Sequence, residues 1–163
     1  MQTQGGKESA VNLNLYETDF YAWTQQQANL LRYQLWNQVD LVNLIEEVES
    51  LGRRERQELR NRLIILIRHL LKWEYQSSKR SRSWLATIRI QRRDIIKLLN
   101  ENPSLQSSLE VALEEAYENA RDLASGETNL PLSTFPSQCL YLWEDLINLN
   151  FYPGEVANDN LMQ

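Results

Sequence analysis

The residues that could do chemistry in this sequence begin with a run of glutamates and a single histidine. Glu46 and Glu49 stand one helical turn apart, and His69 is the only histidine. Carboxylates and an imidazole on facing helices can bind a metal, and two carboxylates one turn apart suit a hard ion such as Mg²⁺. The Glu-x-x-His spacing of di-iron sites is absent, because Leu66 and Lys72 stand three residues from His69. The alternative is that the glutamates are solvated charges and His69 a hydrogen-bonded helix residue.

A second candidate is Cys139, the only cysteine, which follows Phe135 and Pro136 near an expected helix start. A thiol at such a place can have a lowered pKa and act as a nucleophile. Its only possible imidazole base is His69, so the alternative is a buried structural thiol. A lone cysteine cannot form an intramolecular disulfide, which suits a reducing compartment.

The third candidate is a basic stretch. Fourteen of the seventeen lysines and arginines lie between Arg53 and Lys97, although the whole chain has a net charge of −5. Cations interleaved with aromatic rings can neutralise phosphates while the rings stack on unpaired bases. The candidate nucleic-acid surface comprises Lys79, Arg80, Arg82, Arg89, Arg93 and Lys97.

The same charges have a structural explanation. Arg89, Arg93 and Lys97 recur every fourth residue and form one stripe on a helix. The next expected helix carries a matching acidic stripe, made of Glu110, Glu114 and Glu118. Two neighbouring helices could therefore face complementary charges across their rim.

These residues are positioned by helices. Only five glycines and four prolines interrupt the chain, and apolar residues recur at helical spacing between them. We expect an all-α fold, a single-domain helical bundle of about six helices. Residues 1–14 are expected to form a disordered N-terminal tail, 15–154 the helical domain, and 155–163 a disordered C-terminal tail.

Local signals set the expected helix ends. Asp19 or the residue before it caps the first helix, Gly52 ends the second, Ser83 caps the fourth and Gly126 ends the fifth. The third helix, from Arg53, is apolar almost all round and is therefore expected to be central. The second helix has one apolar face, formed by Leu41, Leu44, Ile45 and Val48.

Composition narrows the class of protein. The longest uninterrupted apolar run, 63–67, is far shorter than the roughly 20 residues of a membrane span. No charged-then-apolar export signal is seen, and neither a glycine-rich phosphate loop nor a nucleophile elbow occurs. We expect a cytoplasmic protein without membrane contact.

Several ordered motifs resemble one family, the domain of unknown function 29 family (DUF29), from about Tyr16 to Pro153. These motifs are Asn43–Gly52, His69–Trp73, Arg82–Ser83–Trp84, Pro103–Ser104–Leu105, and Ala116–Tyr117 with Ala120–Arg121. The resemblance implies an all-helical bacterial domain, often cyanobacterial. It brings no activity, cofactor or catalytic residue to this chain.

The functional expectation is a noncatalytic protein-interaction or regulatory module without a cofactor, whose partner is a protein. The alternatives are nucleic-acid binding through residues 72–97 and a carboxylate-bound metal hydrolase. If a shared site exists, we expect it in a polar patch drawn from Glu46, Glu49, His69, Lys72, Arg82 and Trp84.

Overall fold

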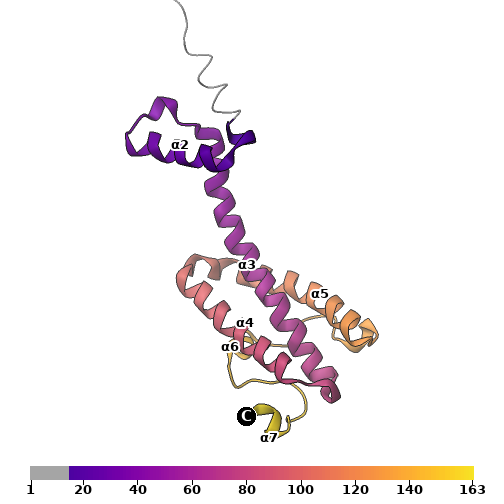
Figure 1. The fold of residues 1–163 in the computed structure, drawn as a ribbon. Helices are drawn as coiled ribbons and strands as arrows, with labels where there is room; N and C mark the ends of the chain where they lie inside the picture. The colour runs from indigo at the N-terminus through magenta and orange to yellow at the C-terminus, as the bar shows by residue number, and fades with distance from the viewer. Residues whose placement is uncertain (1–14) are drawn as a thin grey trace, which may run out of the picture. The chain divides into compact units, whose positions relative to one another are not determined.

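The computed structural model describes residues 15–163, and that part of the chain is helical without any strand (Figure 1). The prediction of an all-α fold is confirmed. The expected N-terminal tail, residues 1–14, lies outside the described residues. None of the described helices is long and apolar enough to cross a membrane.

The chain divides into two compact units, residues 1–53 and 54–163. The sequence predicted one helical domain over 15–154, and its composition does not mark this boundary. The boundary falls within a single helix, α3 (Leu41–Tyr75), which contributes residues to both units.

The described part of the first unit consists of α2 (Phe20–Arg32), the short 3₁₀ turn η1 (Trp36–Gln38) and the beginning of α3. Asp19 caps α2 as predicted, because its carboxylate accepts a hydrogen bond from the Ala22 N–H at 3.0 Å. Trp23 is the only buried apolar side chain in this part of the chain. Its indole N–H donates to Asp40 at 3.1 Å, and the Asp40 backbone N–H donates to Gln27 at 2.8 Å.

The predicted helix end at Gly52 is wrong, because α3 runs through this residue without interruption. Gly52 does not have the positive φ of a left-handed helix stop, and the residues after it are good helix formers. The predicted end at Gly126 is wrong for the same reason. There α5 (Leu109–Thr128) continues until Asn129, whose φ of 57° makes the left-handed cap.

Replacing Gly52 with alanine is expected to stabilise the protein by up to about 1 kcal/mol, because alanine loses less backbone entropy in a helix. A Cβ at this position would meet no atom within 4 Å, so no clash opposes the gain. Urea unfolding followed by circular dichroism measures the change. A destabilised variant would contradict a regular helix at this position.

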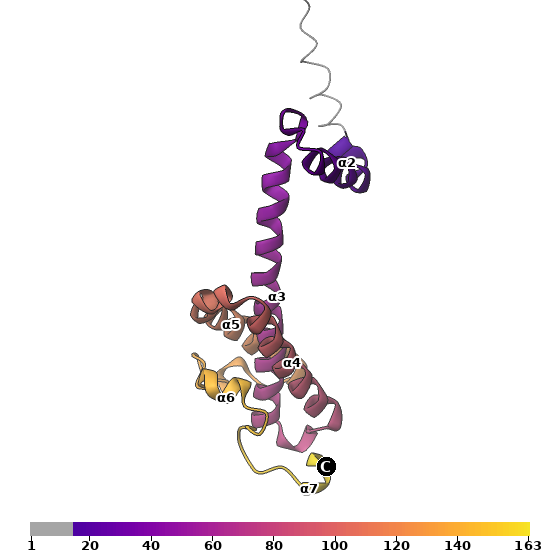
Figure 2. The same cartoon turned by 90° about the vertical axis from the view of Figure 1, so that its left-hand side faces the viewer.

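The second unit contains the remaining elements: the rest of α3, η2 (Ser77–Lys79), α4 (Arg82–Glu101), η3 (Pro103–Ser108), α5, η4 (Leu132–Thr134), α6 (Trp143–Ile147) and α7 (Asp159–Met162). In this unit α4 and α5 lie beside the C-terminal part of α3 (Figures 1 and 2). The predicted central stripe is fully buried, comprising Leu59, Leu63, Leu66, Leu70 and Trp73. The N-cap of α4 is Ser81, whose side chain accepts from the Trp84 N–H at 3.2 Å, so the prediction of Ser83 was wrong by two residues.

Arg92 on α4 is fully buried and joins this helix to the C-terminal segment. Its guanidinium donates to three backbone carbonyls, those of Leu146 at 2.8 Å, Phe151 at 2.7 Å and Asp145 at 3.3 Å. The ring of Tyr152 lies 5.3 Å from the guanidinium carbon. An arginine within the apolar core is tolerated here because its Nε and Nη2 atoms donate to these carbonyls, whereas Nη1 has no hydrogen-bond partner among the described residues.

Candidate functional site

Two residues of the predicted polar patch meet in the second unit. The Lys72 ammonium lies 4.6 Å from the centre of the Trp84 ring and 2.6 Å from a carboxylate oxygen of Glu127. The other oxygen of Glu127 binds Arg68 at 2.9 Å. We call Arg68, His69, Lys72, Trp84 and Glu127 the Lys72 cluster. Its cations are satisfied by one carboxylate and one aromatic face.

Glu127 remains ionised in this cluster. Burial raises the pKa of its carboxyl group, but the hydrogen bond from Lys72 and the charges of Arg68 and Lys72 outweigh burial and lower the pKa below its ordinary value. A carboxylate held by two cations is a poor general base, because protonating it would break both interactions. The arrangement is that of a structural ion pair.

His69 is buried in the same cluster and faces its own helix. Its Nδ1 lies 2.8 Å from the carbonyl oxygen of Ile65, which fixes Nδ1–H as the donor. Burial lowers the His69 pKa; the Ile65 bond opposes this shift, while the charges of Lys72 and Arg68 add to it. His69 is therefore neutral at neutral pH, with the geometry of a hydrogen-bonded helix residue.

Replacing His69 with glutamine is expected to remove a loss of stability in mild acid. Because the folded pKa of His69 is lowered, folding favours the neutral ring, and this stabilisation is present above the unfolded pKa of about 6.5. It is lost as the pH falls from that value towards the folded pKa. Urea unfolding of both proteins at pH 8 and 5.5 measures the difference. The same pH dependence in H69Q would contradict the assignment.

Glu46 and Glu49, the carboxylates of the predicted patch, lie in the first unit, whereas the other four patch residues lie in the second. Both glutamates are exposed and pair with Arg53, which approaches Glu49 at 3.8 Å. Among residues 15–163, no three histidine, cysteine, aspartate or glutamate side chains are grouped closely enough to hold a metal ion.

The basic surface is partly covered by the end of the chain. Residues 155–163, predicted as a disordered tail, include α7 and contact α4. Three arginines donate hydrogen bonds to backbone carbonyls of residues 155–163. Arg80 donates to Glu155 at 2.7 Å, Arg82 donates to Asn160 at 3.2 Å, and Arg89 donates to Met162 at 3.4 Å. These guanidinium groups are already engaged with the protein itself.

The other three basic residues, Lys79, Arg93 and Lys97, are exposed. Lys97 lies 3.8 Å from Glu101 on its own helix. The predicted pairing of the α4 basic stripe with the α5 acidic stripe does not occur among the ion pairs of the described chain. Instead α3 supplies the cations, since Arg60 binds Glu115 at 3.0 Å and Arg62 binds Asp94 at 2.6 Å.

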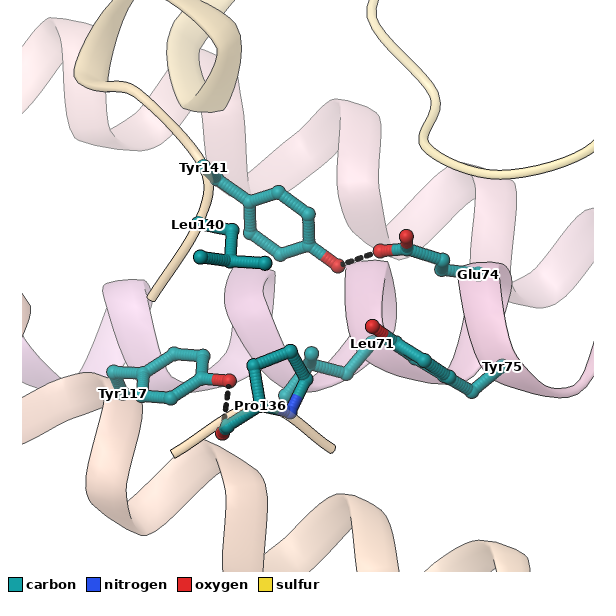
Figure 3. Close-up of a pocket in the computed structure, with 7 residues that line it drawn as sticks. All are labelled: Leu71, Glu74, Tyr75, Tyr117, Pro136, Leu140 and Tyr141. Atoms are coloured by element: carbon teal, nitrogen blue, oxygen red, sulfur yellow. Dashed lines mark hydrogen bonds between the residues drawn. The ribbon is translucent and has the colours of Figure 1, made fainter. Parts of the chain in front are cut away.

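One small cavity lies in the second unit, with a volume of about 30 Å³ (Figure 3). The Tyr141 hydroxyl donates to Glu74 at 2.5 Å, and the Tyr117 hydroxyl donates to the Pro136 carbonyl at 2.7 Å. The cavity is lined by Leu71, Glu74, Tyr75, Tyr117, Pro136, Leu140 and Tyr141. A volume of this size has room for one or two water molecules. Burial raises the pKa of Tyr117 to about 12, so its hydroxyl stays protonated. The cavity is too small for a substrate.

Cys139 lies next to this cavity wall and has no activating neighbour. Its sulfur lies 3.8 Å from the Tyr141 carbonyl oxygen, and burial raises the pKa of the thiol. A protonated thiol is a weak nucleophile. The geometry is that of the structural thiol.

The most unusual surface belongs to the first unit. Eleven large apolar side chains are exposed among residues 15–53, compared with eight among the 110 residues of the second unit. We call them the N-terminal apolar surface: Phe20, Tyr21, Leu31, Tyr33, Leu35, Trp36, Leu41, Val42, Ile45, Val48 and Leu51. Three of these residues, Leu41, Ile45 and Val48, belong to the apolar face predicted for the second helix. Its spacing was the available signal, and only the structure shows that the described residues leave it uncovered.

Comparisons with known proteins give one match. The model of a family described as Domain of unknown function DUF29 matches residues 15–152. No curated protein and no solved structure matches the chain.

Proposed function

We propose that this chain, which belongs to the DUF29 family, is a noncatalytic protein-interaction module of the bacterial cytosol. The observation that supports this proposal is the N-terminal apolar surface. The single cysteine is consistent with a reducing compartment. The acidic and basic groups of the Lys72 cluster are paired with each other.

The size of the surface argues for a partner. The four aromatic members alone expose roughly 500 Å², taking about 150–250 Å² for a whole aromatic side chain. With the seven aliphatic members the total exposed apolar area, summed over α2, η1 and the beginning of α3, is on the order of 1,000 Å². An exposed apolar area of this size marks an interaction site.

Affinity capture from host lysate, with and without nuclease, tests the proposal. The full chain and two variants, Val48→Glu and Val111→Glu, serve as baits. The two valines are matched, because both are helical and their exposed fractions are 61% and 59%. We expect a discrete protein that survives nuclease and is lost only from V48E. Equal capture by V48E, or no capture, would contradict a partner at this surface.

Nucleic-acid binding is the second candidate, favoured by the exposure of Lys79, Arg93 and Lys97 on or beside α4. Phosphate contacts would make binding of a single-stranded oligonucleotide weaken steeply with salt. Changing Arg93 and Lys97 to alanine should reduce both the affinity and the salt dependence. The engagement of Arg80, Arg82 and Arg89 by the C-terminal segment makes this candidate the weaker one.

A further inference from the structure

We infer that the partner at the N-terminal apolar surface is a second copy of this chain, so that two first units form a symmetric dimer. This inference rests on the proposed function and specifies its partner. At the centre of the contact is the apolar stripe of α3, which we call the α3 stripe: Leu41, Leu44, Ile45, Val48 and Leu51.

The first unit buries too little to be stable by itself. Trp23 is its only buried apolar side chain among residues 15–53, and its neighbours in the ring cluster, Tyr16 and Phe20, are partly exposed. A unit of 53 residues is close to the lower size limit at which a chain folds without a disulfide, a metal or association. The only cysteine of the chain lies in the second unit, and the described residues offer no metal cluster. Association is the remaining source of stability.

The available area suits a stable dimer. A standard protein interface buries about 800 Å² on each partner, and the N-terminal apolar surface offers on the order of 1,000 Å². The centre of a homodimer contact is more apolar than that of a transient one, and the α3 stripe is aliphatic at all five positions. Such a surface needs a partner that is present whenever the chain is present, and a second copy meets that condition.

The α3 stripe is complementary to itself. Leu41 and Val48 occupy one heptad position, Leu44 and Leu51 another, and Ile45 widens the face, as in helices that pair. Three charges of this segment, Glu46, Glu49 and Arg53, occupy the outer heptad positions, and Glu47, which flanks the stripe, accepts a hydrogen bond from the Tyr16 hydroxyl at 2.7 Å. Two stripes can therefore meet about a two-fold axis without burying an unpaired charge.

The absence of charge within the stripe also bears on the choice of partner. Helices that pair specifically with a different chain usually have a polar residue in the apolar stripe or charges beside it that complement those of the partner. The five positions of the α3 stripe are all aliphatic. No such selecting residue stands among them, which favours pairing of like with like.

The test is sedimentation velocity of the full chain over a wide concentration range. We expect wild-type protein and V111E to be dimers, and V48E to dissociate with an affinity weakened roughly 100-fold, because each copy carries a glutamate into the contact. Mixing Val48→Glu with Val48→Lys should restore a dimer. Wild-type protein that stays monomeric, or V48E that dimerises as well as V111E, would overturn the inference.

Two further measurements separate the possible failures. Circular dichroism shows whether V48E is folded; if it is not, the melting temperature of wild-type protein still decides, since a dimer melts higher at higher concentration. A monomeric chain that captures a different protein through Val48 would refute the second copy and leave the proposed function standing. A chain that dimerises but captures no different protein from lysate would support the second copy and exclude a different protein at this surface.

Discussion

Replacing Arg92 with alanine is expected to lower the free energy of unfolding by about 3–5 kcal/mol. The substitution removes the donor for the carbonyls of Leu146, Asp145 and Phe151 and leaves a cavity in the core. Buried carbonyls without a donor keep the full cost of desolvation. Because the three carbonyls lie in one segment, the loss also releases that segment from α4.

Its neighbour provides the matched control. Arg93 is exposed on the same helix, so R93A should change the free energy of unfolding by less than about 0.5 kcal/mol. Arg92→Lys keeps the positive charge but lacks the planar fork of donors, so its free energy of unfolding should lie between those of R92A and R93A. Urea unfolding followed by circular dichroism ranks the three variants. An R92A protein within 1 kcal/mol of R93A would show that the three bonds are replaced by water.

The sequence alone predicts much of the second unit, because the apolar residues that repeat at helical spacing there are also the residues that are buried. The α3 residues from Leu59 to Trp73 repeat at helical spacing, and α4 and α5 cover them. Helix ends are less predictable, since Ser81 and Ser83 carry the same side chain and only backbone geometry decides which one caps α4. Gly52 illustrates the same limit, because glycine permits a helix stop without requiring one.

The candidate site is less predictable because its partners are remote in sequence. Glu127 lies 55 residues from Lys72, and no pattern links an acidic residue on α5 to a lysine on α3. The role of Arg92 is even harder to predict, because its hydrogen-bond partners are backbone carbonyls, which every residue possesses. Among the fourteen basic residues of this stretch, nothing in the sequence distinguishes the two that are buried, Lys72 and Arg92.

The first unit shows what periodicity can and cannot establish. The spacing of the α3 stripe predicts an apolar face that avoids water, but it does not state which surface covers it. In the structure Ile45 and Val48, two members of this face, are exposed among the described residues. Because the α3 stripe is apolar and yet largely exposed among the described residues, we infer that a second copy of the chain covers it.

Replacing Lys72 with alanine is expected to lower the free energy of unfolding by about 2–3 kcal/mol, the second largest effect considered. Lys72 is only 6% exposed, and the change removes both its ion pair with Glu127 and its contact with the Trp84 ring. Arg68 remains to neutralise Glu127, which limits the loss. Lys79, an exposed lysine, is the control, and K79A should be nearly neutral.

A methionine at position 72 separates the two contributions. Lys72→Met keeps an unbranched side chain beneath Trp84 and loses only the charge, so we expect a cost of about 1 kcal/mol at pH 7. The lowered pKa of Glu127 gives stability that is present above its unfolded pKa of about 4.3 and lost as the pH falls through the folded value. Without Lys72 that pKa is less depressed, so the acid-induced loss should be smaller in the variant. Urea unfolding at pH 7 and pH 3.5 measures both effects, and an unchanged acid loss would show that Arg68 alone sets the pKa of Glu127.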